Sequence, residues 1–292
     1  MNYFSKFPNA IFNNSDGSIS QVKDLLRRVV FTDESYLQDS NYEPYLIKDN
    51  ETPDMVAQKF YDDPRLHWII ILYNTLLDPF YSFPLSRTSF ETFIAKKYEG
   101  QALFLSPEEN DFEIPFSSAA GAFEAGDKIS TRYFDGQIEK FNNETQSAQI
   151  KRTDYGMSKI ELSNQVGVNF AVGDVIARRK TILETIRGKV RKVIGSKFAP
   201  HHFEFENSKG EKILLNPMGT YPVGDEASQQ HFGEGSFQDT LLHRYIYNDE
   251  DDFIITNQEH ETRLNNQRKN ILVPKKFIVQ KINQEFESLV RK

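Results

Sequence analysis

Two helix-start signals, each followed by a dense apolar run, lie within residues 45–86 and constrain the fold more than any other stretch. Thr52 followed by Pro53 is typical of a helix start, because an N-cap hydroxyl accepts a hydrogen bond and proline is tolerated in the first turn. Asp63 and Pro64 repeat the signal before "RLHWIIILYN", which is apolar almost all round and is therefore expected to be buried. With the strand "YLIKDN" before them and the extended "DPFYSFPLS" after them, these segments predict the order strand, helix, helix, strand.

Periodicity within this segment also predicts its core. The first helix is expected to turn Met55, Val56 and Phe60 inward, and the second is expected to bury Trp68 against it. Asn74 is the predicted end of the second helix. A further helix, "SFETFIAKKYEG", should follow.

The pattern F-x-x-G-D-x-I occurs twice, at residues 123–129 and 170–176. Gly-Asp before a β-branched run is typical of a turn that enters a strand. Short strands with turns at this spacing predict a small antiparallel barrel within residues 115–215. The stretch 201–215 is predicted to be a hairpin that turns at residues 208–210.

The N-terminal arm carries spaced aromatic rings at Phe4, Phe7 and Phe12 but too few apolar residues to fold alone. It is either disordered or docks these rings on another surface. Capping-box spacing at Ser18 and Gln21 predicts a short helix from Gln21 to Val30.

At the other end, "TNQEHETRLNNQRKN" predicts a helix, and "ILV" predicts a short strand before Pro274. The last helix is predicted to carry one apolar stripe. That stripe consists of Phe277, Ile278, Ile282, Phe286 and Leu289.

The chain is therefore predicted to be an α+β protein with a small antiparallel β-barrel insertion and C-terminal helices. Its predicted segments are an N-terminal arm with a short helix (1–40), a βααβ module with a helical tail (41–100), a barrel-like domain (115–215), a loop-rich connection (216–252) and a C-terminal helical segment (253–292).

Composition excludes several classes of function. The net charge is −7, whereas a nucleic-acid-binding protein needs a basic surface. The absence of cysteine excludes disulfides, thiolate metal sites and thiol nucleophiles. The N-terminus lacks the apolar region and cleavage site of a secretory signal, and the longest strongly apolar run, "WIIILY", is too short to cross a bilayer. Neither a nucleic-acid partner nor a membrane is expected.

The sequence offers little catalytic chemistry. His201, His202 and Glu204 come nearest to a metal or acid–base cluster. Because neighbouring side chains of a strand point to opposite faces, the two histidines are not expected to converge, although His202 and Glu204 can. A third ligand would have to come from elsewhere in the chain.

The acidic run at residues 248–252 lacks the alternating ligands and the glycine of a calcium loop. The chain has no nucleophile elbow, no P-loop and no G-x-G-x-x-G motif. We therefore predict no catalytic residue, no cofactor and no metal, and hence no enzyme.

The segment from "YLIKDN" to "WIIILYN" resembles a LysM module, which has a βααβ fold. "ETPDMVAQKFY" stands where that family has G-D-T-L-x-x-I-A-x-x-Y, and the second helix ends on the asparagine that LysM sequences favour. The sequence departs from the pattern at Asp49-Asn50, in place of Gly-Asp, and in the aromatic return loop "LLDPFYSFP". Glycan-binding LysM loops are usually more polar.

Together with "FPNAIF", "VKDLLRRVVF" and the C-terminal segment, this module is similar to the LysM-bearing wedge protein fifty-three of T4-like contractile-tail phages. The similarity covers roughly residues 1–100 and 250–292. Its most distinctive part is the pattern N-x-x-R-x-I-x-V, formed by Asn265, Arg268, Ile271 and Val273. The middle of the chain, about residues 115–215, does not map onto the shortest members of the family.

This resemblance implies a non-enzymatic virion protein that is present in several copies around the tail baseplate and is made and assembled in the host cytoplasm. The implied partners are other wedge subunits, among them the wedge-arm and sheath-initiating proteins of the inner ring. Large apolar rings in the arm, the return loop and the last helix are the expected contact residues. They are Phe4, Phe7, Phe12, Phe80, Tyr81, Phe83, Phe277 and Phe286.

Two alternatives stay open. The rings of the return loop can instead fold back as the module's own core, and alternation along the loop allows a different answer for each ring. The module can also be a peptidoglycan-binding domain attached to a cell-wall-acting protein. The single module copy and the aromatic loop favour the baseplate role.

Overall fold

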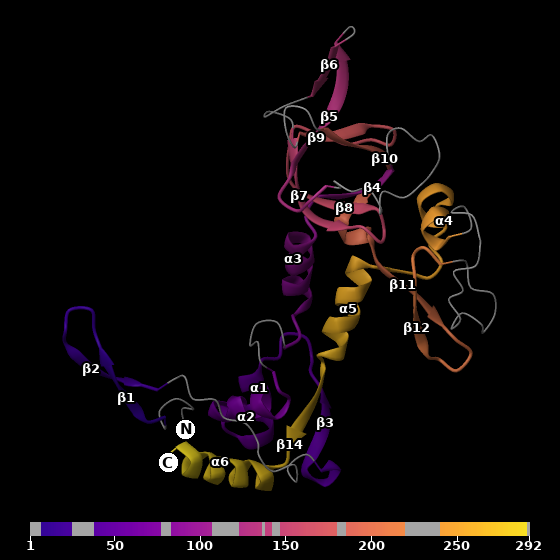
Figure 1. Ribbon diagram of the computed structural model, residues 1–292. Helices are drawn as coiled ribbons and strands as arrows, with labels where there is room; N and C mark the ends of the chain where they lie inside the picture. Colours follow the sequence, from indigo (N-terminus) through magenta and orange to yellow (C-terminus); the bar gives the residue numbers. More distant parts are fainter. Residues whose placement is uncertain are drawn as a thin grey trace. The chain divides into compact units, whose positions relative to one another are not determined.

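A computed structural model describes residues 7–24, 38–76, 83–106, 123–135, 138–141, 147–179, 185–219 and 240–290. The chain is a mixed α+β protein that divides into two compact units (Figure 1). Unit 1 comprises Met1–Glu91 and Thr262–Lys292, and unit 2 comprises Thr92–Glu261. The chain enters unit 2 within α3 (Arg87–Lys97) and leaves it within α5 (Asn257–Gln267).

Unit 1 begins with a two-stranded antiparallel hairpin of β1 (Asn9–Asn13) and β2 (Ile19–Lys23). Gly17 has φ +82°, which glycine adopts without strain, and Ser18 donates its backbone N–H to Asp16 over 2.9 Å. The predicted helix is thus wrong at its start, because Gln21 lies in β2; residues 25–37 lie outside the described part.

The next elements of unit 1 follow the prediction. After a short 3₁₀ turn (Asp39–Asn41) come β3 (Tyr42–Leu46), α1 (Pro53–Tyr61), a second 3₁₀ turn (Pro64–Leu66) and α2 (His67–Tyr73). The Asp63 side chain accepts the backbone N–H of Arg65 and so starts the second turn. Asn74 follows the last residue of α2, as predicted.

The strand that pairs with β3 comes from the far end of the chain. It is β14 (Asn270–Pro274), antiparallel to β3 with Leu46 opposite Asn270. Residues 77–82 lie outside the described part, and residues 83–86 are not a strand. The predicted strand–helix–helix–strand order within residues 45–86 is therefore wrong in its last member.

Asn74 explains why β14 lies where it does. Its amide nitrogen donates to the carbonyl oxygen of Leu272 over 2.8 Å, and its amide oxygen accepts the N–H of the same residue over 2.8 Å. The asparagine therefore satisfies both backbone groups of Leu272 on the side of β14 that does not face β3.

The core of unit 1 lies between α1, α2, β14 and α6 (Lys276–Val290). Its members include Val56, Trp68, Ile70, Ile282 and Phe286, each at most 6% exposed. Phe60 packs against this cluster from its edge.

One predicted core position is wrong, because Met55 is 55% exposed while its neighbour Val56 is buried. On the predicted stripe of α6, Ile278, Ile282 and Phe286 are buried, whereas Phe277, also predicted to be a contact residue, is 51% exposed. The side chain of Leu289 lies outside the described residues.

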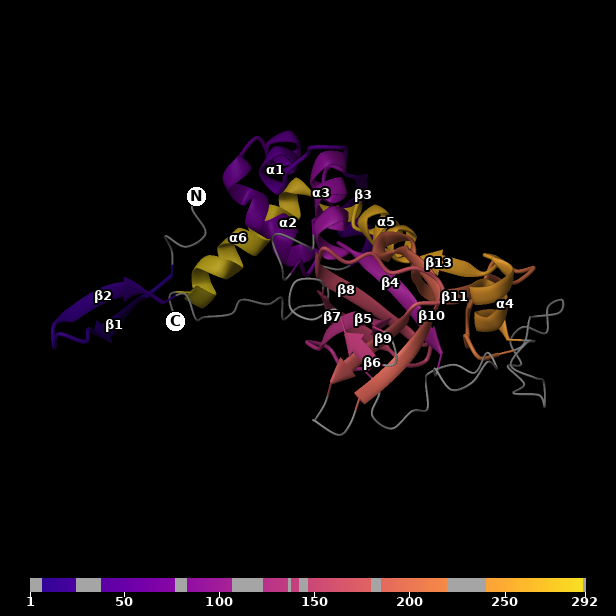
Figure 2. The ribbon, with the colours of Figure 1, turned by 90° about the horizontal axis from the view of Figure 1, so that it is seen from above.

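Unit 2 is built on a closed antiparallel barrel (Figure 2). Its strands pair in the order β5 (Lys128–Asp135), β7 (Ser147–Asp154), β8 (Lys159–Val166), β4 (Gln101–Ser106), β10 (Thr185–Gly195) and β9 (Val175–Arg179), and β9 pairs back to β5. Strand β6 (Ile138–Phe141) extends β5 as a hairpin.

The two F-x-x-G-D-x-I copies open β5 and β9, as predicted, and these strands pair with each other. Their turns share one geometry. Gly126 and Gly173 have φ +95° and +94°, and Asp127 and Asp174 each accept a backbone N–H over 2.7 Å. The sequence repeat is therefore a structural repeat within one barrel.

The barrel differs from the prediction in the first and last stretches of sequence that belong to it. It includes β4, which lies before residue 115, and excludes the predicted hairpin of β11 (Pro200–Glu206) and β12 (Lys212–Leu215). That hairpin forms a separate sheet with β13 (Ile254–Thr256), next to a 3₁₀ turn at Ser196–Phe198.

The stretch 216–252, predicted to be loop-rich, contains α4 (Leu241–Asn248), whose N-cap Thr240 accepts the N–H of His243. Residues 220–239 lie outside the described part.

Candidate protein interface

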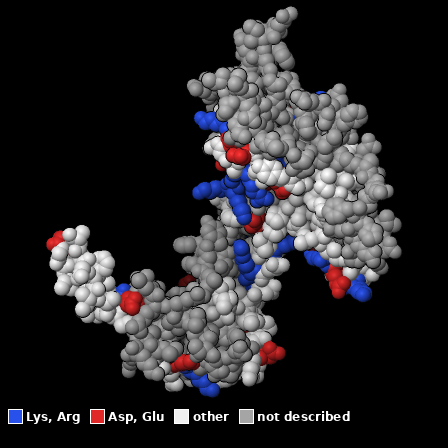
Figure 3. Space-filling view, in the orientation of Figure 1, with Lys and Arg blue, Asp and Glu red and all other residues white. Residues whose placement is uncertain are grey.

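The β1–β2 hairpin exposes apolar side chains on both faces. Ile11 and Ile19 are 78% and 72% exposed, and Phe12 and Val22 on the other face are 56% and 42% exposed. Between residues 9 and 22 the only charged side chain is Asp16, and Figure 3 shows the hairpin as largely uncharged. An isolated two-stranded hairpin is only marginally stable in water, so this surface is suited to binding another protein.

The hairpin is joined to the core of unit 1 through Phe7. The Phe7 ring lies 5.9 Å from that of Phe286, which in turn lies 4.7 Å from Trp68. Lys23, at the end of β2, donates its ammonium to the Phe7 carbonyl oxygen over 2.8 Å. The arm therefore docks one of its rings on its own chain, one of the two alternatives left open by the sequence.

The predicted contact residues fall into three groups. Two are exposed, namely Phe12 and Phe277. Three are buried in the core of unit 1, namely Phe7, Phe83 and Phe286. Three lie outside the described residues, namely Phe4, Phe80 and Tyr81.

The three buried rings correct the prediction, because a ring that fills its own core presents no surface to a partner. Sequence reasoning also missed Ile11, Ile19 and Val22, which the Asp16-Gly17 turn signal could have placed on a hairpin.

A second surface feature of unit 1 is a groove of about 250 Å³ between residues 48–52 and 83–86. Asp49 accepts the backbone N–H of Arg87 over 3.0 Å and so begins α3. On the other side, Asn265 accepts the N–H of Leu85 over 2.8 Å and donates to its carbonyl over 3.1 Å. Asn265, the first residue of the N-x-x-R-x-I-x-V pattern, thus fixes one wall of the groove.

Asn265→Ala is expected to lower the free energy of unfolding by about 1–3 kcal/mol, because it leaves two backbone groups of Leu85 without their partner. Chemical denaturation of the variant measures this loss. The matched control is Asn266→Ala, since Asn266 is exposed on the same helix. Equal stability of Asn265→Ala and the control would contradict the role of the Asn265 side chain.

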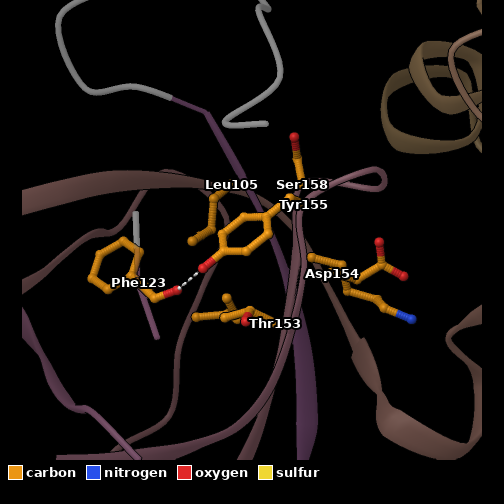
Figure 4. Close-up of a pocket in the computed structure, with 8 residues that line it drawn as sticks. Leu105, Phe123, Thr153, Asp154, Tyr155 and Ser158 are labelled. Atoms are coloured by element: carbon orange, nitrogen blue, oxygen red, sulfur yellow. Dashed lines mark hydrogen bonds between the residues drawn. The ribbon is translucent and has the colours of Figure 1, made fainter. Parts of the chain in front are cut away.

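The barrel interior of unit 2 is filled by side chains. A cavity of about 10 Å³, room for about one water, lies beside Tyr155, whose ring points toward Leu105 and Phe123 (Figure 4). The Tyr155 hydroxyl donates to the Phe123 carbonyl over 3.1 Å. Within its described residues, this barrel is a packed core rather than a ligand-binding lumen.

The acidic run 248–252 is held by ion pairs with the rest of unit 2. Lys192 lies 2.6 Å from Asp249 and Arg244 lies 3.2 Å from Glu250. The Lys192 ammonium holds the pKa of Asp249 below its usual value through a hydrogen bond and its charge. These contacts make the run part of the turn that ends α4.

His201 and His202 converge, contrary to the prediction. Their Nδ1 atoms are 2.8 Å apart, and the ring of His260 stacks on that of His201 with 3.7 Å between centroids. The pairing of β11 with β13 shifts by one residue between Pro200 and His202, which is a β-bulge. A bulge interrupts the alternation of side chains, and the sequence carries no clear signal for it.

One member of the histidine cluster, His201, is uncharged at neutral pH. Burial, together with the charges of His260 and His202, lowers the pKa of His201 to about 4. His202 also lies 3.5 Å from Glu204, as the sequence allowed.

Among the described helices, none has the length and apolarity required to cross a membrane. Among the described residues, four of the exposed large apolar side chains lie together on the β1–β2 hairpin.

A family model described as base plate wedge protein 53 matches residues 7–102, from two residues before β1 to the second residue of β4. The match covers about a third of the chain and confirms, over these residues, the resemblance to a baseplate wedge protein. The C-terminal part of the resemblance lies outside the matched range. No curated protein matches the chain.

Proposed function

We propose that this chain is a non-catalytic wedge subunit that links neighbouring wedges of a contractile-tail baseplate through protein–protein contacts. The observation that carries the proposal is the β1–β2 hairpin, which exposes apolar residues on both faces and lies within the segment matched by the wedge family model. An apolar hairpin that pairs with no other described strand gains stability when a partner covers it or extends its sheet.

The other proposed contacts are the loop Asp78–Pro84, through Phe80 and Tyr81, and α6, through Phe277. Phe277 stands on the face of α6 opposite the buried Ile282, so it is available without unfolding the module. The proposed partners are other wedge subunits, including the wedge-arm and sheath-initiating proteins of the inner ring. Several copies would stand around the virion baseplate, after assembly in the host cytoplasm.

The test is a variant that makes the hairpin polar, Ile11→Ser with Ile19→Ser. We expect the purified variant to keep the thermal stability of the wild type, because both side chains are exposed, and to fail to support assembly of tails. Tail assembly is scored by electron microscopy of particles made with the variant as the only source of the protein. The matched control is Gln21→Ser, a polar position opposite Ile11 in the hairpin. Normal assembly with the double variant would remove the face of the hairpin that carries Ile11 and Ile19 from the interface.

A second candidate function is glycan binding by the LysM-like module, favoured by the polar groove between residues 48–52 and 83–86. Sedimentation of the purified chain with cell-wall fragments tests it. Tight binding that is lost in Glu51→Ala, at the groove wall, would favour this candidate over the wedge linker.

A further inference from the structure

The three histidines of unit 2 are held by elements that fix their positions. The β-bulge in β11 turns His201 and His202 to one side. His260 lies in the first turn of α5, whose start is fixed by a capping box between Thr256 and Glu259, with hydrogen bonds of 2.9 and 3.2 Å. Ligands carried by such supported elements need little ordering when an ion binds.

Candidate ligand atoms of the three side chains all lie within 4.8 Å of one another. The Nδ1 atoms of His201 and His202 are 2.8 Å apart, and two imidazole nitrogens on one tetrahedral ion lie roughly 3.3 Å apart. A hydrogen bond between these two nitrogens requires a proton on one of them. An ion there would replace that proton and push the rings slightly apart.

Glu204 supports coordination through Nδ1 of His202. Its carboxylate lies 3.5 Å from Nε2 of His202, and its other oxygen lies 3.4 Å from the Lys212 ammonium. A proton on Nε2 that points to a carboxylate leaves Nδ1 with a free lone pair, the arrangement common behind metal-bound histidines.

We propose that His201, His202 and His260 bind one divalent transition-metal ion of the Zn²⁺ class, with Glu204 as the positioning residue behind His202. Neutral imidazoles suit Zn²⁺, Cu²⁺ and Ni²⁺ better than Mg²⁺ or Ca²⁺, which prefer oxygen ligands. All three side chains are only partly buried, so water can complete the coordination. The ion ties β11 to α5 and has a structural role independent of the wedge function.

Two features of the histidine cluster oppose the binding of a metal ion. His260 must leave its stack on His201, because the in-plane lone pairs of parallel rings do not meet at one ion. Arg152 and Lys159 place positive charge near His201, which disfavours a cation there. The Glu204 carboxylate supplies the compensating negative charge.

The experiment is calorimetric titration of the full chain, purified without a polyhistidine tag, with ZnCl₂. We expect one ion per chain, loss of binding in His202→Gln with His260→Gln, and binding about 10–100-fold weaker in Glu204→Ala. His67→Gln, a histidine in α2 outside the cluster, is the matched control and should bind as the wild type does.

Absence of binding by the wild type would overturn the proposal, as would equal binding by the double variant or an equal loss in the control. If the double variant does not fold, the visible spectrum of the wild type with Co²⁺ decides. Bands of a nitrogen-ligated tetrahedral ion support the site, and the spectrum of the hydrated ion overturns it.

Discussion

Replacing Trp68 by alanine is expected to lower the free energy of unfolding by about 3–5 kcal/mol, as large-to-small changes of buried aromatic residues do. Trp68 is 6% exposed and its ring lies 4.7 Å from Phe286. The change therefore removes the contact between α2 and α6 and leaves a cavity at the centre of unit 1. Guanidinium denaturation followed by circular dichroism measures the loss.

The control for Trp68 is Phe277→Ala, which removes an aromatic ring of α6 that is 51% exposed. Its effect on stability should stay below about 1 kcal/mol, since surface substitutions rarely exceed that range. If Trp68→Ala were as stable as this control, Trp68 would be a surface residue and the described core would be incorrect.

Removing the carboxylate of Glu161 is expected to lower the free energy of unfolding by a similar amount, about 3–5 kcal/mol. The change leaves the buried ammonium of Lys159 without its ion-pair partner. Lys159 is fully buried, and its Nζ lies 3.2 Å from Glu161 and donates to the Pro200 carbonyl over 2.7 Å. Burial lowers the pKa of Lys159, which shows that the protein interior disfavours its charge. The variant is Glu161→Leu, and thermal and chemical denaturation measure it.

The double variant Lys159→Met with Glu161→Leu distinguishes the cost of leaving a buried charge unpaired from the cost of changing the side-chain packing. Apolar replacement of both members of a buried ion pair is often neutral or stabilising, so the double variant should recover most of the stability lost in Glu161→Leu. A double variant less stable than Glu161→Leu would show that the Lys159–Pro200 hydrogen bond, rather than the ion pair, dominates this site.

Local signals in the sequence predicted the elements that local chemistry determines. Thr52-Pro53 and Asp63-Pro64 begin helical turns, and the repeated Gly-Asp turns open paired strands of one barrel. In each case the signal and its consequence lie within a few residues, and the tertiary structure agrees with the local preference.

The sequence did not predict the pairing of strands that lie far apart along the chain. Nothing near residue 45 indicates that β3 pairs with residues 270–274, and nothing in "PHHFEF" indicates the bulge that joins His201 and His202. The hairpin at residues 9–23 and helix α4 did carry signals, Asp16-Gly17 and Thr240 before two leucines, which polar surroundings obscured.

The contact residues were predicted as large apolar rings in the arm, the return loop and the last helix, and these properties do not distinguish a core from an interface. Phe83 and Phe286 are in the core, and Phe12 and Phe277 are on the surface, although the immediate sequence neighbours of these rings do not separate the two pairs. What separates them is the face of the element on which each stands, and that depends on packing partners far away in the chain.

The pairing of Leu46 with Asn270 also bears on the order in which the chain acquires its structure during synthesis. The ribosome releases β3, α1 and α2 early but releases β14 and α6 only near the end, so the apolar faces of the first helices stay uncovered while unit 2 is being made. The residues of unit 2 are contiguous, and its strands can pair as soon as they emerge. We therefore expect the barrel, which is encoded later than α1 and α2, to be complete before the module that precedes it.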